Sequence, residues 1–287
     1  MQPLLKNRTI MITGASSGIG EAYVRELGSV ANTLVLVARR TERLEQIADE
    51  VKTKNPELRV SIQTCDLQHR EAIDSMLTSV KEDVGTIDVL INNAGFGDIC
   101  LVENADWEKL ERMVAVNINA VCYLTRRLVP EMVAQGHGGV MNVGSYLGLS
   151  TMPAFSMYTG TKHFITGFTE SLRAELRGTG VAVTLVCPGP VDTEFKAAAA
   201  LPSYAKPPGW LEISARTCAR SSLRGFRWRR PLVIPGLIPK VLFNLFLIFP
   251  RPVHRVVNGF MGRFVRKNQN RLLGQSGLEN TDQNQGS

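Results

Sequence analysis

The sequence has no acidic residue between Ile213 and Leu278, although this stretch holds 13 Lys and Arg residues. Up to Glu212 the balance is reversed, with 24 Asp and Glu against 20 Lys and Arg. The net charge of +7 therefore comes from the C-terminal part, and a segment of this kind attracts anions. Because aliphatic residues alternate with the basic ones and no nucleic-acid-binding motif is present, we expect no nucleic acid partner.

Other absences narrow the class of protein. None of the five cysteines, an odd number, forms a C-x-x-C pair, which argues against a disulfide framework and favours reduced thiols in the cytoplasm. No N-terminal charged region precedes a long apolar run, so we expect no signal peptide. We also expect no metal site. The apolar run at 241–249 is too short to span a bilayer. With 287 residues and 44% hydrophobic content, the chain can form one large domain with an extension.

Stretches typical of strands and helices alternate along the first two thirds of the chain. This alternation predicts a parallel sheet with helices on both faces, an α/β fold. Ligands bind such sheets at the carboxyl ends of the strands. The predicted strands are 7–13, 33–37, 59–64, 87–91, 140–143 and 181–186, and the predicted helices are 21–27, 41–54, 68–84, 106–132 and 156–177.

A glycine-rich turn follows the first predicted strand. It runs Gly14-Ala15-Ser16-Ser17-Gly18-Ile19-Gly20 and leads into a segment of helical composition. Glycines let the backbone approach a pyrophosphate closely, and the N-terminus of the following helix favours the negative charge. The spacing differs from the commonest G-x-G-x-x-G fingerprint, and a helix start without a ligand is the alternative interpretation.

Tyr158 and Lys162 are four residues apart in a predicted helix, so they share one face. A phenol titrates near ~10, and a nearby cation favours its phenolate. The pair is therefore typical of an acid/base device. Taken alone, it is explained equally well as a chance pairing on a solvated helix.

The motifs of the first 195 residues form a joint pattern that is more specific than any one of them. Besides the glycine turn from Thr13 and the Tyr158–Lys162 pair, they include Asn92-Asn93-Ala94-Gly95, Asn117, Ser145, and Pro188-Gly189 followed by Thr193. From about Lys6 to Phe195 the chain resembles the short-chain dehydrogenase/reductase family. The resemblance implies a single Rossmann-type, doubly wound parallel sheet. Two positions depart from the family pattern, since Gly144 stands where a second Ser is frequent and Gly160 where Ala is usual.

The resemblance also implies a role for each reacting group. Tyr158 donates a proton to the carbonyl oxygen in reduction, or removes one from the alcohol in oxidation, and Ser145 hydrogen-bonds the same oxygen. Lys162 holds the nicotinamide ribose and lowers the pKa of Tyr158, while Asn117 positions a water in the proton relay. The implied cofactor-binding residues are Gly14, Ser16, Ser17, Gly18, Ile19, Gly20, Arg39, Asp66, Leu67, Asn93, Ala94, Gly95, Tyr158, Lys162, Pro188, Gly189, Val191 and Thr193.

The end of the second predicted strand decides the cofactor, because the 2′ position of a dinucleotide lies there. An acidic residue there binds a free 2′-hydroxyl, but this chain has Ala38 followed by Arg39 and Arg40. An arginine suits a phosphate, so we predict NADP(H), with Arg39 as the main contact and Ser16 as a helper. We place Arg40 on the solvated face of the next helix, and two ordinary surface arginines are the alternative. Asp66 resembles the adenine-amino contact of the family, and a helix N-cap also explains it.

The chain divides into three parts by composition. Residues 1–230 form the predicted NADP(H)-binding catalytic domain, with a substrate lid at about 195–215. Residues 231–272 hold the last strand and the C-terminal apolar and amphipathic basic helices, a basic, apolar helical extension. Residues 273–287 are polar and predicted to be disordered.

The amphipathic part of the extension allows two interpretations. Val253, Val256, Val257, Phe260, Met261 and Phe264 have helical spacing, with basic residues elsewhere on the wheel. Such a helix beside an apolar one can lie on an anionic membrane surface, at the inner face of a membrane. Burial against the catalytic domain, a partner subunit or the substrate cleft is the alternative. The character of this part resembles long-chain 3-oxoacyl and hydroxysteroid reductases of the same family.

These features predict an NADP(H)-dependent oxidoreductase that interconverts a ketone or aldehyde and an alcohol on a lipophilic substrate. The alternatives are a non-catalytic NADP(H)-binding sensor or scaffold, and a cofactor-recycling epimerase or dehydratase on the same fold. By resemblance we expect a homo-oligomer that forms through helices at 104–134 and 156–177. The expected pocket residues, which core packing would explain as well, are Phe96, Leu147, Met152, Phe155, Phe195 and Trp210.

Overall fold

The computed structural model describes residues 4–195, 199, 207–249 and 251–284. A seven-stranded sheet has the order β3-β2-β1-β4-β5-β6-β9, and every neighbouring pair of strands is parallel. This order confirms the predicted Rossmann-type, doubly wound α/β fold. The strands are β1 (Thr9–Thr13), β2 (Thr33–Ala38), β3 (Arg59–Thr64), β4 (Val89–Asn92), β5 (Gly138–Val143), β6 (Val181–Val186) and β9 (Leu232–Val233).

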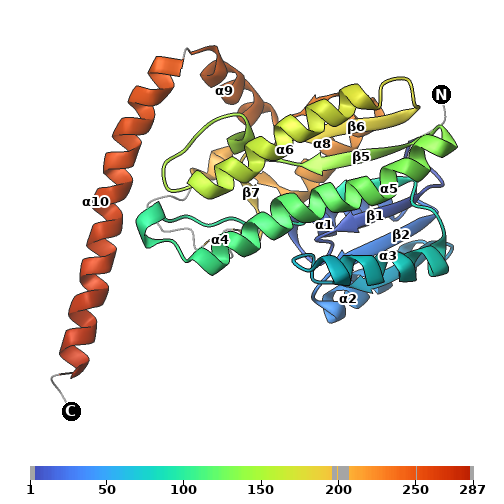
Figure 1. Cartoon of the computed structure of the whole chain (residues 1–287), viewed down its shortest axis with the longest axis horizontal. Coiled ribbons are helices and arrows are strands. Elements are labelled where there is room, and N and C mark those ends of the chain that lie inside the picture. Colours follow the sequence, from blue (N-terminus) through green and yellow to red (C-terminus); the bar gives the residue numbers. More distant parts are fainter. Residues whose placement is uncertain (1–3, 196–198, 200–206, 250, 285–287) are drawn as a thin grey trace.

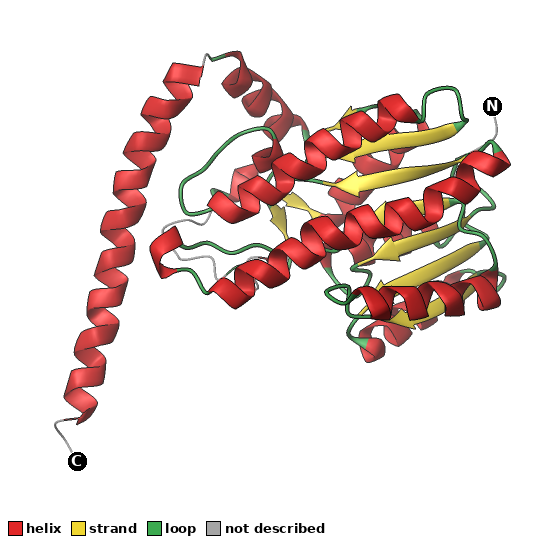
Figure 2. Cartoon of the chain, viewed as in Figure 1, coloured by secondary structure: helices red, strands yellow, loops and turns green. Residues whose placement is uncertain are grey.

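Helices cover both faces of the sheet (Figures 1 and 2). One hydrophobic core lies between the sheet and α1, α2 and α8, and a second lies between the sheet and α3, α5 and α6. Ile10 and Ile12 of β1 belong to the first core and Met11 to the second, because neighbouring side chains of a strand point to opposite faces. Burial on both faces explains why the central strands are continuous apolar runs. The helices are α1 (Gly18–Leu27), α2 (Thr41–Lys54), α3 (Arg70–Val84), α4 (Trp107–Val114), α5 (Val121–Gln135), α6 (Ser156–Glu175) and α8 (Ala215–Arg227), with the 3-10 turns η1 (Val102–Asn104) and η3 (Tyr146–Gly148).

The segment predicted as one helix at 106–132 contains a change of helix type. A π-helical stretch, η2 (Ala115–Ala120), joins α4 to α5. Single π turns of this kind are frequent at functional sites. The stretch contains Asn117, whose side chain is buried.

The predicted C-terminal helices are present as α9 (Leu237–Ile248) and α10 (Arg251–Asn284). Figure 1 shows α10 crossing one end of the body, apart from the sheet. Hydrogen bonds from Asn258 to Thr151 (2.7 Å) and from Arg266 to Glu103 (2.6 Å) join α10 to the body. None of the helices that the structure describes is long and apolar enough to cross a membrane.

The disorder expected for residues 273–287 stays a prediction. Residues 273–284 continue α10, and residues 285–287 lie outside the described part.

The predicted lid at about 195–215 lies only partly within the described residues, since 196–198 and 200–206 are outside them. Its described part includes η5 (Gly209–Leu211) and β8 (Ile213–Ser214). Strand β8 pairs in parallel with β7 (Val191–Asp192), which follows β6. The end of the lid is therefore fastened beside the carboxyl end of the main sheet.

Candidate active site

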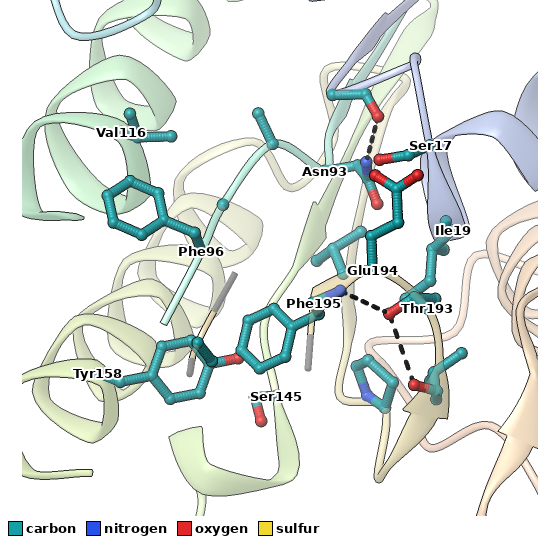
Figure 3. A pocket seen from close by; sticks show the side chains of 18 of the residues that line it. Ser17, Ile19, Asn93, Phe96, Val116, Ser145, Tyr158, Thr193, Glu194 and Phe195 are labelled. Atoms are coloured by element: carbon teal, nitrogen blue, oxygen red, sulfur yellow. Dashed lines mark hydrogen bonds between the residues drawn. The ribbon is translucent and has the colours of Figure 1, made fainter. Parts of the chain in front are cut away.

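A cavity of about 910 Å³ lies at the carboxyl ends of the strands. Figure 3 shows Phe96, Val116 and Tyr158 at one side of it and Ser17 and Ile19 at the other. The predicted site residues all line this cavity except Gly20 and Asn117, which are buried. The structure thus brings together residues that the sequence separates by up to 179 positions, as from Gly14 to Thr193.

The glycine turn lines the cavity just before and at the start of α1. Gly14 and Gly18 have backbone φ values of +67° and +57°, which residues other than glycine rarely adopt. A Cβ atom at Gly20 would lie 2.1 Å from the carbonyl oxygen of Gly14, so the turn closes tightly on the start of α1. The first N–H groups of α1 have no partner within the helix, and with the helix dipole they suit a phosphate.

The turn is fixed to β4 by hydrogen bonds. The hydroxyl oxygen of Thr13 accepts from the backbone N–H groups of Asn93 and Ala94, both at 3.0 Å. The side chain of Asn93 donates to the carbonyl oxygen of Thr13 at 2.9 Å. Asn93 therefore holds two walls of the cavity together, and the Asn-Ala-Gly motif has a structural task in this chain.

Tyr158 and Ser145 form the centre of the site. Tyr158 is 7% exposed, and its ring packs on Phe195 with 5.5 Å between ring centroids. Burial raises the pKa of Tyr158 well above its ordinary value, while a hydrogen bond with Ser145 acts in the opposite sense. The phenol is consequently held in its protonated form, which is the form that donates a proton.

Lys162 lies one helical turn from Tyr158, as the spacing predicts. Its Nζ is 5.7 Å from the centroid of the Tyr158 ring and donates to the carbonyl oxygen of Val143 at 3.0 Å. Burial lowers the pKa of Lys162 to about 8. The desolvation of the phenolate is the largest effect on the pKa of Tyr158, and the lowering of this pKa by Lys162 that the resemblance implies stays a prediction.

The side chain of Asn117 joins three elements behind the cavity. Its Oδ1 accepts from the N–H of Phe96 at 3.1 Å, and its Nδ2 donates to the carbonyl oxygen of Phe96 at 2.9 Å and to Thr161 at 3.1 Å. These bonds connect η2 with the loop after β4 and with α6. They fix the position of α6, which carries Tyr158, relative to that loop.

Two arginines follow β2 on the cavity wall, and the placement of Arg40 differs from the prediction. Arg40, expected on a solvated helix face, donates from Nε to the Ser16 hydroxyl at 3.4 Å. Its guanidinium also forms an ion pair with Glu194 at 2.9 Å. Arg39 lines the same cavity and is exposed. Arg40 therefore contacts the glycine turn, and Arg39 follows the end of β2 on the wall of the same cavity.

Asp66 is not a helix N-cap. Helix α3 begins at Arg70 after His69, and Asp66 accepts instead from the backbone N–H of Gln68 at 3.0 Å. Its second carboxylate oxygen accepts from the Gln68 side chain at 3.2 Å. Gln68 lines the cavity and was not among the predicted residues.

The apolar wall confirms most of the expected pocket residues. Phe96, Leu147, Met152, Phe155 and Phe195 line the cavity, whereas Trp210 is 63% exposed and does not. Trp210 follows a proline-rich loop, where no helical or strand periodicity indicates which way a side chain points, so its place in the pocket was predicted wrongly. The charged residues Lys109 and Arg112 also line the cavity, and they were not predicted because their sequence pattern is typical of the solvated face of a helix.

Within the described residues, no group of three or more His, Cys, Asp or Glu side chains is arranged to hold a metal ion.

The sheet order, the glycine turn and the Ser145–Tyr158–Lys162 arrangement together define an oxidoreductase of the dinucleotide-dependent type. The chain belongs to the short chain dehydrogenase family, whose model matches residues 8–201.

Individual relatives agree with this assignment. An uncharacterized oxidoreductase of Staphylococcus saprophyticus is 36% identical over 193 residues, 67% of this chain and 77% of that protein. The NADP-dependent 3-hydroxy acid dehydrogenase YdfG of Escherichia coli is 35% identical over 188 residues, 65% of this chain and 74% of that protein. Among solved structures, a short-chain dehydrogenase from Sphingobium yanoikuyae in complex with NADPH matches with a TM-score of 0.74 and 28% identity, covering 85% of this chain and 96% of that one.

Proposed function

We propose that the protein catalyses the NADP(H)-dependent interconversion of a ketone or aldehyde and an alcohol on a lipophilic substrate. The observation that carries this proposal is the buried pair of Tyr158 and Ser145 on the wall of a cavity that also holds the glycine turn. Apolar residues dominate the end of the cavity near Tyr158, which supports a lipophilic substrate.

The cofactor is NADP(H), in agreement with the NADPH complex of the Sphingobium relative and the NADP dependence of YdfG. The residues of this chain fit such a group, because the turn leaves N–H groups free at the start of α1 and Arg39 and Arg40 follow β2. When bound, the nicotinamide supplies or accepts the hydride. Lys162 holds the ribose next to it, and Asp66 with Leu67 faces the adenine end.

During reduction, negative charge builds up on the carbonyl oxygen of the substrate. The hydroxyl groups of Tyr158 and Ser145 both donate hydrogen bonds to this oxygen, and Tyr158 transfers its proton. The phenol of Tyr158 is protonated at neutral pH, and the hydrogen bond with Ser145 acts against the rise in its pKa that burial causes. Asn117 acts as a positioning residue, because its hydrogen bonds to Phe96 and Thr161 fix α6 in the geometry that this transfer needs.

The decisive experiment compares NADPH oxidation by the wild type and by Tyr158→Phe. The substrates are long-chain 3-oxoacyl thioesters, steroid ketones and aldehydes, and NADPH binding by both proteins serves as the control for folding. We expect kcat to fall by about 10²- to 10⁴-fold in Tyr158→Phe with NADPH binding unchanged. Turnover that survives the substitution contradicts the proposal. Tight NADPH binding without any turnover favours a sensor, and substrate conversion without net NADPH consumption favours an epimerase or dehydratase.

Two further interactions belong to this proposal. Helices α9 and α10 contact an anionic membrane surface, because apolar side chains are exposed on both and the segment 213–278 has no acidic residue. Flotation with anionic and neutral liposomes tests this contact, comparing the wild type with Leu245→Gln/Phe260→Gln. Equal flotation of both proteins contradicts it. The exposed apolar residues are Leu237, Ile238, Val241, Leu242, Leu245, Ile248, Phe249, Val253, Val256, Val257, Phe260 and Phe264.

The second interaction is a homo-oligomer formed through α5 and α6. Phe164 of α6 is 44% exposed and stacks on Phe168, with 6.2 Å between ring centroids. A large aromatic side chain on the surface is typical of an interface. Light scattering of Phe164→Glu against the wild type tests this, and a monomeric wild type contradicts it.

A further inference from the structure

Helix α4 presents a cationic side chain to the substrate end of the cavity. Lys109, Arg112 and Val116 all line the cavity, and their spacing of three and four residues places them on one helix face. Figure 3 shows Val116 beside Phe96 on the same side as Tyr158, away from Ser17 and Ile19. Arg112, one turn before Val116, therefore lies at the end of the cavity that the glycine turn does not occupy.

The two cations of this face differ in their ionic partners. Lys109 Nζ lies 2.5 Å from the carboxylate of Asp98, and both side chains are largely buried. This ion pair neutralises Lys109 and fastens the loop at Asp98 to α4. Arg112, by contrast, has Glu108 as its one ionic neighbour among the described residues, at 4.0 Å and with both side chains well exposed. That distance is too long for a hydrogen bond, so the guanidinium keeps its donors available for a ligand.

The surroundings of Arg112 select an amphiphilic ligand. A guanidinium pairs with a carboxylate or a phosphate through two parallel hydrogen bonds. The rest of this end offers mainly apolar side chains, against which a hydrocarbon chain gains free energy by burial. The apolar residues concerned are Phe96, Ile99, Val116, Met152 and Phe155.

We propose that Arg112 determines substrate specificity by binding an acidic group at the far end of the substrate. The substrate is then a lipophilic carbonyl compound that carries either a carboxylate, as in an oxo acid, or the phosphate of a thioester carrier. Its carbonyl group lies at Tyr158. In an oxo acid the apolar chain lies between the carbonyl group and Arg112, whereas in a thioester the carrier arm lies between them and the acyl chain lies beyond the carbonyl group. This inference rests on the proposed reductase activity and adds the class of substrate to it.

Steady-state kinetics on matched pairs of substrates test this role. The pairs are oxo fatty acids with their methyl esters, and oxoacyl-coenzyme A thioesters with their uncharged N-acetylcysteamine thioesters. In Arg112→Gln we expect kcat/KM for the charged member to fall by about 10- to 100-fold and kcat/KM for the neutral member to stay unchanged. A split in the oxo fatty acid pair indicates that Arg112 binds a carboxylate, and a split in the thioester pair indicates that it binds a phosphate. Arg112→Lys restores part of the loss because it keeps the charge without the planar fork.

Arg224→Gln provides the matched control, since it removes the same charge from an exposed position on α8 that does not line the cavity. Equal losses on charged and neutral substrates in Arg112→Gln, or no loss on either, overturn the inference. Calorimetric binding of a medium-chain fatty acid and its amide separates this inference from the reductase proposal, because it needs no turnover. Preferential binding of the acid that disappears in Arg112→Gln supports the role of Arg112, and equal binding of acid and amide overturns it.

Discussion

The guanidinium of Arg40 lies 2.9 Å from the carboxylate of Glu194 while it also reaches the hydroxyl of Ser16. This ion pair connects the end of β2 with the segment after β7. The next residue, Phe195, packs on Tyr158. A phosphate that binds Arg40 must therefore compete with Glu194, and that competition links the glycine-turn end of the cavity to the ring of Phe195, which packs on Tyr158.

Replacing Glu194 by Gln removes this competitor and a negative charge. We expect the dissociation constant for NADPH to fall by about 2- to 5-fold, because an exposed ion pair contributes roughly 0.2–1 kcal/mol. The dissociation constant for NADH, which lacks the 2′-phosphate, should not change. Fluorescence titration with both cofactors measures the two constants, and an equal gain for NADH would show that Glu194 does not compete with a phosphate.

The contribution of each of the two arginines after β2 to NADPH binding can be measured by single substitutions. We expect Arg39→Ala and Arg40→Ala each to raise KM for NADPH by about 10- to 100-fold, as loss of a charged hydrogen bond does, with little effect on KM for NADH. Arg43→Ala, on α2 and outside the cavity lining, serves as the control. Steady-state kinetics with both cofactors measure these constants. Equal effects on NADPH and NADH would remove the argument for 2′-phosphate recognition.

Two glycine-to-alanine substitutions should have opposite effects on stability. At Gly20 an added Cβ would meet the carbonyl oxygen of Gly14 at 2.1 Å, so the turn must shift, and we expect a loss of about 1–3 kcal/mol together with weaker NADPH binding. At Gly160 the Cβ would meet nothing within 4 Å on an exposed face of α6, so alanine should stabilise by about 0.5–1 kcal/mol. Urea unfolding of both variants gives the two free energies. A destabilising Gly160→Ala would indicate a contact that the structure lacks.

The sequence alone predicts the elements whose burial follows a regular pattern, which is continuous in β6 and confined to one face in α2. The helix predicted at 41–54 is α2, and the strand predicted at 181–186 is β6, because local composition reflects the packing of both. The π-helical turn around Asn117 was not predicted, since apolar periodicity does not register one extra residue per turn. Its purpose becomes visible only through the bonds of Asn117 to Phe96 and Thr161.

In the candidate site, too, contacts between residues that are distant in the sequence could not be predicted. The positions of Ser145, Tyr158 and Lys162 could be predicted from the sequence. Ser145 follows β5 at the carboxyl end of the sheet, and Tyr158 and Lys162 lie one turn apart on the next long helix, α6. The orientation of Arg40 depends on Ser16 and on Glu194, which is 154 residues away in the sequence, so no local pattern contains it.

The buried ammonium of Lys162 should make the stability of the ligand-free protein depend on pH. Burial lowers the pKa of Lys162 from 10.5 to about 8, so between these values the unfolded chain binds more protons than the folded one. Stability then rises with pH across this window, whereas below about pH 8 the burial of the charge costs stability in full. From pH 7 to about 9.5 we expect the wild type to gain roughly 2 kcal/mol relative to Lys162→Met. Tyr158, whose pKa is raised, reduces stability only above its unfolded value near ~10 and so leaves this range unaffected. Urea unfolding of both proteins at the two pH values measures the difference, and parallel changes in wild type and variant would show that Lys162 titrates as it does in water.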